Sequence, residues 1–335
     1  MASRSDSHKA ARPIWRRRGA LLSLLAWTLV FGAHLAYGSL VAQPALAAGA
    51  LAGLFVLAAL SVSGGLRQDL GRISGLYWLA GLFALVIIAG LLSLTPYGPG
   101  GAHPVWAFVG LSPGAGSLDR SATLLELVKL LGLGSFFIIG LMLGAEDERA
   151  ETAILIFLAF ACAYALWAFF AFTTGAIYQT QRGRLEGTLL SPNTAGTFFG
   201  VALVIAFGAL GRRLHKSQGR ARLDVVAPFW AAVMILGVCL LLTLSRTAAL
   251  GALASLLALS LLLFFSGQAS LSRAAWTGLL GTGLVALAVV IFGEPLVERF
   301  GRLDADQTAR GELYALHWRA FLASPLGGVG LGNFD

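Results

Sequence analysis

The sequence predicts an all-α, polytopic membrane protein with about nine transmembrane helices. Of its 335 residues, 57% are hydrophobic and only 12% are charged, and the mean hydropathy is +0.80. A helix needs roughly 20 apolar residues to cross a hydrocarbon core of ~30 Å, and several runs reach that length with one charge or none. No long alternating pattern suggests a membrane β-barrel, so helices that satisfy their own backbone hydrogen bonds are expected.

Nine apolar segments carry this prediction. The expected spans are 20–42, 44–63, 74–94, 122–144, 152–174, 193–211, 226–244, 247–265 and 274–293. The first follows the basic stretch RPIWRRRG, but it is too long for a signal peptide and lacks a small-residue cleavage site, so we expect a retained helix. We therefore expect a cytoplasmic tail (1–19), a transmembrane domain (20–293) and an outward-facing region (294–335).

The distribution of basic residues predicts the orientation, because cytoplasmic loops carry an excess of Lys and Arg. If the N-terminus is cytoplasmic, the inner side receives Arg12, Arg16, Arg17, Arg18, Arg67, Arg72, Arg149, Arg212, Arg213, Lys216, Arg220, Arg222 and Arg273. The outer short loops receive only Arg120, Arg182, Arg184 and Arg246. The formal charge of +8 is thus scattered between apolar segments, which favours membrane topology over nucleic-acid binding.

One outer arginine stands in a very short turn. The run CLLLTLSRTAALGALASLLALSLLLFF (239–265) surrounds Arg246 with two apolar stretches that together equal about two membrane thicknesses. The chain must therefore turn back close to Arg246, which places this cation at the outer membrane face rather than at mid-bilayer, where it would cost ~2.5–3.5 kcal/mol.

A second outer feature precedes the sixth expected span, in the stretch RGRLEGTLLSPNTAG. Ser191 can cap the helix and Pro192 can be its first residue, so the positive helix end would point outward and attract an anion. Arg182 and Arg184 lie a few residues earlier. The two cysteines, Cys162 and Cys239, lie within apolar runs and are expected to be packing residues, with no metal or cofactor site.

The C-terminal region contains a helical pattern in TARGELYALHWRAFLASP. Arg310, Tyr314, His317 and Phe321 share one face by their spacing. Arg184, Arg246 and Arg310 together form a candidate cradle for phosphate, which arginine binds with two parallel donors. The alternative is that these arginines reach lipid headgroups or pair with nearby carboxylates such as Glu186, Asp304 and Glu312.

Three other features have structural explanations that compete with functional ones. His317 is a weak candidate for a catalytic base, and a structural histidine is the competing interpretation. Glu126 and Lys129 predict an ion pair near a helix end, or a polar lining for a lipid carrier's path. The glycines of GVGLG do not follow a strand, so we expect them to let this segment pack closely against membrane helices rather than bind a dinucleotide.

The motifs RLEGTLLSPNTAG, LLTLSRTAALGAL and ARGELYALHWRAFLASPLGGVGLGNF, taken in order over residues 120–335, resemble the O-antigen ligase and polysaccharide polymerase family of the bacterial cell envelope. The resemblance implies a metal-independent, inverting glycosyltransferase of GT-C type in the inner membrane. At the periplasmic face of the membrane, such an enzyme would transfer a glycan from undecaprenyl diphosphate to a saccharide or lipid A-core acceptor, in lipopolysaccharide or exopolysaccharide biosynthesis.

The resemblance also implies which residues act. Arg184, Arg246 and Arg310 match the family's periplasmic arginines and are expected to hold the donor diphosphate together with Asn193, with Arg246 and Arg310 assisting catalysis. The family's His-Asn pair and last spans have no counterpart before Asp335, so we expect a chain cut within its catalytic loop. A flippase or transporter of lipid-linked sugars, or an inactive fragment of the family, are the alternatives.

Overall fold

The structure is a computed structural model. It describes residues 14–36, 38, 41–98, 100–111, 114–176, 183–216, 223–265, 303–325 and 328–333. Within these ranges the chain is helical and has no strand, which confirms the all-α prediction. Seven of the described helices are long and apolar enough to cross a membrane, so the chain is a polytopic membrane protein.

The described helices follow the expected spans closely. They are α1 (Ile14–Leu35), α2 (Ala42–Val62), α3 (Gly64–Gly71), α4 (Leu76–Ser93), α5 (Val105–Phe108), α6 (Arg120–Gly144), α7 (Asp147–Thr174), α8 (Pro192–Lys216), α9 (Leu223–Leu242), α10 (Arg246–Phe265) and α12 (Leu303–Ala323). The expected count of nine spans is higher than seven because the apolar part of α1 is shorter than a full span and 274–293 lies outside the described residues. The short helices α3 and α5 were not predicted.

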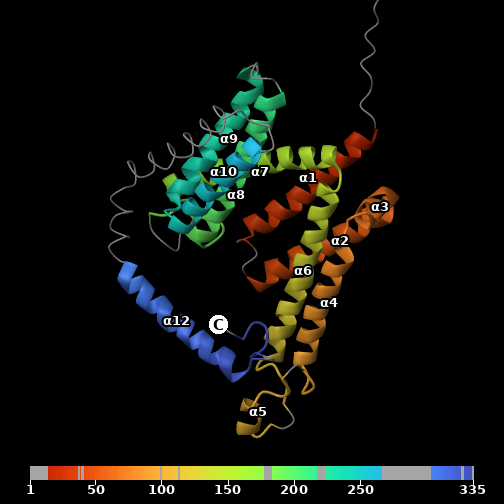
Figure 1. Cartoon of the computed structure of the whole chain (residues 1–335), viewed down its shortest axis with the longest axis vertical. Helices are drawn as coiled ribbons and strands as arrows, with labels where there is room; N and C mark the ends of the chain where they lie inside the picture. Colours follow the sequence, from red (N-terminus) through yellow and green to blue (C-terminus); the bar gives the residue numbers. More distant parts are fainter. Residues whose placement is uncertain are drawn as a thin grey trace, which may run out of the picture.

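The helices pack into two groups that share α1 and α7. Small side chains let α7, α8 and α9 approach closely, since Ala161, Ala165, Ala202 and Ala206 are fully buried in one apolar core. The second core joins α1, α2, α6 and α7. Figure 1 shows α8, α9 and α10 side by side in the first group, with α4 beside α6 in the second.

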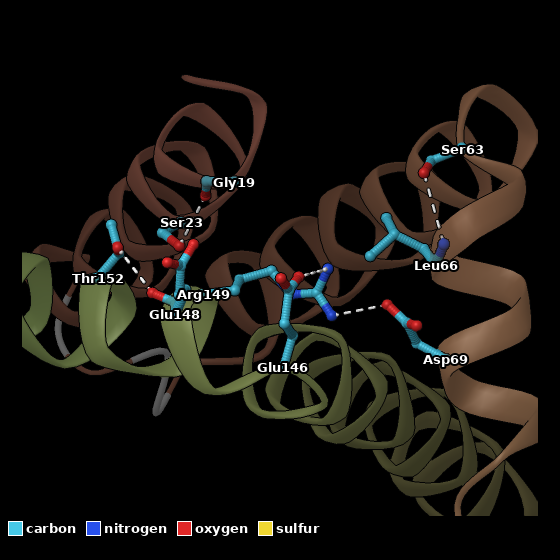
Figure 2. Close-up of polar contacts among 9 residues, drawn as sticks. All are labelled: Gly19, Ser23, Ser63, Leu66, Asp69, Glu146, Glu148, Arg149 and Thr152. Carbon is cyan, nitrogen blue, oxygen red and sulfur yellow. Dashed lines mark hydrogen bonds and ion pairs between the residues drawn. The ribbon is translucent and has the colours of Figure 1, made fainter. Parts of the chain in front are cut away.

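Charged residues join helix ends on the side of the α6–α7 turn. The Arg149 guanidinium lies 3.0 Å from the Asp69 carboxylate of α3 and 3.6 Å from Glu146 (Figure 2). Arg212 and Arg213, at the end of α8, pair with Glu151 of α7 at 3.4 and 3.6 Å. The three arginines were all assigned to one membrane face, and the structure brings their helix ends to the same side of the helices.

The opposite helix ends position the candidate site. α7 and α9 end there, and α8 and α10 begin there. Below this bundle lies α12, and the C-terminal segment returns to the first turn of α6 (Figure 1). The orientation of these faces relative to the cytoplasm stays a prediction from the basic residues.

Candidate functional site

The segment after α7 is an irregular loop that is buried within the protein. Arg184, Leu185, Glu186, Thr188 and Leu189 are each at most 7% exposed. Loops usually run over the surface, because buried backbone groups need hydrogen-bond partners. The loop finds such partners in its neighbours: the Leu185 amide donates to the Leu242 carbonyl at the end of α9, over 2.9 Å, and Leu185 and Leu189 fill the apolar core.

A hydroxyl network fixes the middle of this loop to α7 and α1. The Thr188 amide donates to the Tyr164 hydroxyl at 3.1 Å, and the Thr188 hydroxyl donates to the His34 carbonyl at 2.7 Å. The Tyr164 hydroxyl and the Thr188 hydroxyl are 3.1 Å apart, so the Tyr164 hydrogen completes the network by donating to Thr188. Gly187 has φ +60°, and a Cβ there would lie 2.4 Å from the Tyr164 oxygen, so only glycine fits this position.

Arg184 connects this loop to the α9–α10 turn. Its Nε donates to the Thr243 carbonyl at 2.9 Å, and its Nη2 lies 3.4 Å from both the Leu244 carbonyl and the Asn193 Oδ1. The expected turn at Arg246 is confirmed, because α9 ends at Leu242 and α10 begins at Arg246. The buried guanidinium therefore shapes the turn that presents Arg246.

The starts of α8 and α10 are built alike and meet each other. Leu190 and Leu244 have φ +54° and +49°, which is strained for a non-glycine residue, and a serine follows each. Ser191 and Ser245 accept from the amides of Thr194 and Ala248 at 3.4 Å. The sequence predicted the Ser191 cap and the start at Pro192, and both are confirmed.

A direct hydrogen bond joins the two helix starts. The Ser245 hydroxyl donates to Asn193 Oδ1 at 3.0 Å, and the same oxygen lies 3.4 Å from the Arg184 Nη2. Each helix start carries a partial positive charge, and Arg184 and Arg246 add full charges. The arrangement brings these positive charges together, beside a loop that also holds the fully buried Glu186 carboxylate, and arginines at helix starts suit a phosphate or diphosphate group.

The predicted site residues differ in how the structure places them. Arg184 and Asn193 are in contact, and Arg246 follows Ser245 as the half-buried first residue of α10. Arg310 lies in α12, but its side chain is outside the described part of the chain, as is Arg182. The proposed roles of the four diphosphate-binding residues stay predictions.

The glycine segment packs against the start of α6, as its composition predicted. A Cβ on Gly330 would lie 2.6 Å from the Ser117 hydroxyl, and a Cβ on Gly332 would lie 2.8 Å from Glu126 Cγ. The Thr123 hydroxyl donates to the Leu331 carbonyl at 2.9 Å. The Glu126–Lys129 ion pair is also confirmed, beside this contact.

Sequence reasoning missed the surface that receives this segment. The Asn333 amide group donates to the Ser117 hydroxyl at 3.0 Å, and the Leu118 amide donates to the Val329 carbonyl at 3.0 Å. The partners are more than 200 residues apart, so no local pattern could have indicated them. His317 is exposed, and its Nδ1 lies 2.7 Å from the Leu313 carbonyl one turn earlier.

Comparison with known protein families identifies the C-terminal part of the chain. Residues 231–335 match the family model described as O-Antigen ligase. This chain carries an O-antigen ligase domain. The match begins within α9 and includes the Arg246 turn, α10, α12 and the glycine segment, whereas the motif resemblance began at residue 120. Comparisons with curated proteins and with solved structures gave no match.

The O-antigen ligase domain supports glycan transfer of the ligase or polymerase type, which requires a lipid-linked glycan donor and an acceptor. The loop of Arg184 and the start of α8 precede the matched residues. They are nevertheless bonded to the α9–α10 turn, which lies within the O-antigen ligase domain.

Proposed function

We propose that this protein binds the diphosphate of an undecaprenyl-linked glycan at the joined starts of α8 and α10, and transfers the glycan to an acceptor on the periplasmic face. The observation that supports the proposal is the contact among Arg184, Asn193 and Ser245 beside Arg246. This contact brings two positive helix ends and two arginine charges together, in a protein whose O-antigen ligase domain supports glycan transfer from a lipid-linked donor in general.

The proposed reaction is a single displacement. The acceptor hydroxyl oxygen forms a bond to the anomeric carbon from the face opposite the diphosphate, the bond from that carbon to the diphosphate oxygen breaks, and the configuration is inverted. The proton of the acceptor hydroxyl passes to a base. Negative charge grows on the departing diphosphate, and positioned cations stabilise it.

The residues of the cradle have different roles in this proposal. Arg246, and Arg310 from α12, neutralise the diphosphate, so no metal ion is required for that task. Asn193 and Arg184 line the cradle, and Arg184 also holds the α9–α10 turn. A ligase and a polymerase would share this donor site and differ in the acceptor. The bacterial inner membrane, with the N-terminus in the cytoplasm, is the proposed location.

The decisive experiment replaces Arg246 in cells that lack the chromosomal gene. Arg246→Ala should lower the transfer of polymer on the order of 10²-fold, the typical loss for one positioned donor, while the lipid-linked glycan accumulates. Arg246→Lys should retain part of the activity, because it keeps the charge and loses the paired donors. Surface polysaccharide on gels and extracted carrier-linked glycan are the measurements.

The matched control is Arg120→Ala. Arg120 is also the first residue of a helix, on the face where the C-terminal segment contacts α6, but it is exposed and lies in a different helix from the cradle. It should leave transfer unchanged at equal protein level. If Arg246→Ala also leaves transfer unchanged, Arg246 is a topological anchor and the cradle is wrong.

A further inference from the structure

The glycine segment after α12 fits tightly against the start of α6. Gly330 has φ +97° and Gly332 has φ +73°, and both conformations favour glycine. A Cβ added to Gly330 would lie 2.6 Å from the Ser117 hydroxyl, and one added to Gly332 would lie 2.8 Å from Glu126 Cγ. Backbone conformation and contact therefore both require glycine at these two positions. The GVGLG pattern serves a specific docking, which the proposed transfer reaction alone does not explain.

A chain of side-chain hydrogen bonds closes this contact. The Asn333 amide group donates to the Ser117 hydroxyl at 3.0 Å, and the Thr123 hydroxyl donates to the Leu331 carbonyl at 2.9 Å. The two hydroxyls are 2.8 Å apart, and both residues are fully buried. The chain of bonds thus leaves the C-terminal segment at Asn333 and returns to it at Leu331. Because buried polar groups need partners, this network favours one docked position of the segment.

Backbone hydrogen bonds continue the docking to the end of α12. The Leu118 amide donates to the Val329 carbonyl at 3.0 Å, and the Gly328 amide donates to the Ser324 carbonyl at 2.9 Å. The Ser324 amide in turn donates to the Ala320 carbonyl, in the last turn of α12, at 3.3 Å. The end of α12 is therefore tied to the start of α6 through a continuous set of hydrogen bonds.

α12 itself is held by little else in the described part of the chain. Of residues 311–322, only Ala320 is half-buried and the others are exposed. Arg310 precedes Ala323, the last residue of α12, by 13 positions, which is about 20 Å along the helix. A tilt of about 10° at the docked end would move position 310 by roughly 3.5 Å, whereas a functional site must be held within about 0.5 Å. The firmness of the docking therefore determines how precisely position 310 is placed.

We propose that Ser117, Thr123 and Asn333 are positioning residues for glycan transfer, because they hold the docked end of α12 and so set the place of α12 relative to the cradle. The inference rests on the proposed function, in which Arg310 of α12 neutralises the diphosphate. Ser117 and Thr123 precede the residues matched to the O-antigen ligase domain. The part of the chain before this domain thus positions a helix within it.

The first measurement is the distance between two spin labels in the full chain, on Glu312→Cys of α12 and Leu250→Cys of α10. Both positions are exposed, and the two native cysteines are replaced by alanine. The distance distribution should be narrow with Thr123 in place and broader by roughly 3 Å in the Thr123→Val variant, which loses the hydroxyl and keeps the shape. Thr123→Ser, which keeps the hydroxyl, should restore the narrow distribution.

The second measurement is transfer in cells that lack the chromosomal gene, at equal protein level. Thr123→Val should lower transfer on the order of tenfold, because a misplaced group stabilises the departing diphosphate poorly. In an Arg310→Ala background the same substitution should cause no further loss, since the group that it positions is gone. The matched control is Ser23→Ala, which removes another fully buried hydroxyl, bonded within α1, and should leave transfer unchanged.

Three results would overturn the inference. The first is an unchanged distance distribution in Thr123→Val, and the second is a pair of losses, from Thr123→Val and Arg310→Ala, that multiply as a general folding defect would. The third is unchanged transfer in Arg310→Ala. The distance measurement requires no transfer, and the cradle is tested separately by Arg246→Ala. A failure of the docking and a failure of the proposed function are therefore distinguishable.

Discussion

Gly187→Ala should destabilise the protein through one specific contact, the approach of residue 187 to the Tyr164 hydroxyl. The residue has φ +60°, and the new methyl group would lie 2.4 Å from the hydroxyl oxygen. That oxygen cannot move without weakening two hydrogen bonds to Thr188, both of 3.1 Å. The substitution therefore adds backbone strain and disrupts the network that fixes the buried loop.

The two contributions can be estimated separately. Alanine in the left-handed conformation costs roughly 1–2 kcal/mol. Two weakened hydrogen bonds cost about 0.5–1.5 kcal/mol each, or roughly 1–3 kcal/mol together. Tyr164→Phe alone should cost the second amount. In the Tyr164→Phe background the clashing oxygen is absent and the nearest ring carbon lies 3.2 Å from the new Cβ, so Gly187→Ala should cost mainly the strain. The double variant should then be roughly 1–3 kcal/mol more stable than the sum predicts.

The assay is equilibrium unfolding of the purified protein in mild detergent by titration with sodium dodecyl sulfate, for the wild type, both single variants and the double variant. Gly183→Ala is the matched control, because Gly183 has φ +78° but a Cβ there meets nothing within 4 Å. Its cost should be additive with that of Tyr164→Phe. If Gly187→Ala and Tyr164→Phe are also additive within about 0.5 kcal/mol, the contact does not hold the loop, and the reasoning fails.

Other contacts lead to further predictions. Gly132→Ala should lower the free energy of unfolding, because its Cβ would lie 2.8 Å from the Gly49 Cα. Gly140→Ala should be neutral or stabilising by up to about 1 kcal/mol, because a Cβ there meets nothing within 4 Å. The same titration with sodium dodecyl sulfate compares the two variants. Ser245→Ala removes a helix cap and the bond to Asn193, and should cost about 1 kcal/mol and reduce transfer, while Ser245→Thr should restore both. Thr123→Val should release the C-terminal segment, measured as faster proteolysis after α12 with unchanged global unfolding.

Most of the helical architecture could be predicted from hydropathy. Each apolar run of membrane length either coincides with a helix or lies outside the described residues, because the need to satisfy backbone hydrogen bonds in lipid leaves few alternatives. The turn at Arg246 was predicted for the same reason, since two spans left almost no residues between them. The helices α3 and α5 were missed because eight and four residues are too short for a periodic signal.

The site was predictable only in part. Serine and proline at the start of α8 are local signals, and the start of this helix was therefore predicted. The contact of Arg184 with the α9–α10 turn joins residues 59 positions apart, and the bond from Ser117 to Asn333 joins residues 216 apart. Such pairs depend on how helices pack, and no periodic pattern in one sequence encodes them.

The geometry also explains why position 184 carries arginine rather than lysine. Buried backbone carbonyls need hydrogen-bond partners, and the Thr243 and Leu244 carbonyls lie in the turn between α9 and α10. One guanidinium reaches both carbonyls and the Asn193 amide oxygen from a single buried position. A lysine ammonium is a point donor on a flexible chain and lacks the rigid fork of donors that reaches these three acceptors. Arg184 therefore stabilises the strained turn, and the turn in turn holds Arg246 beside the joined helix starts.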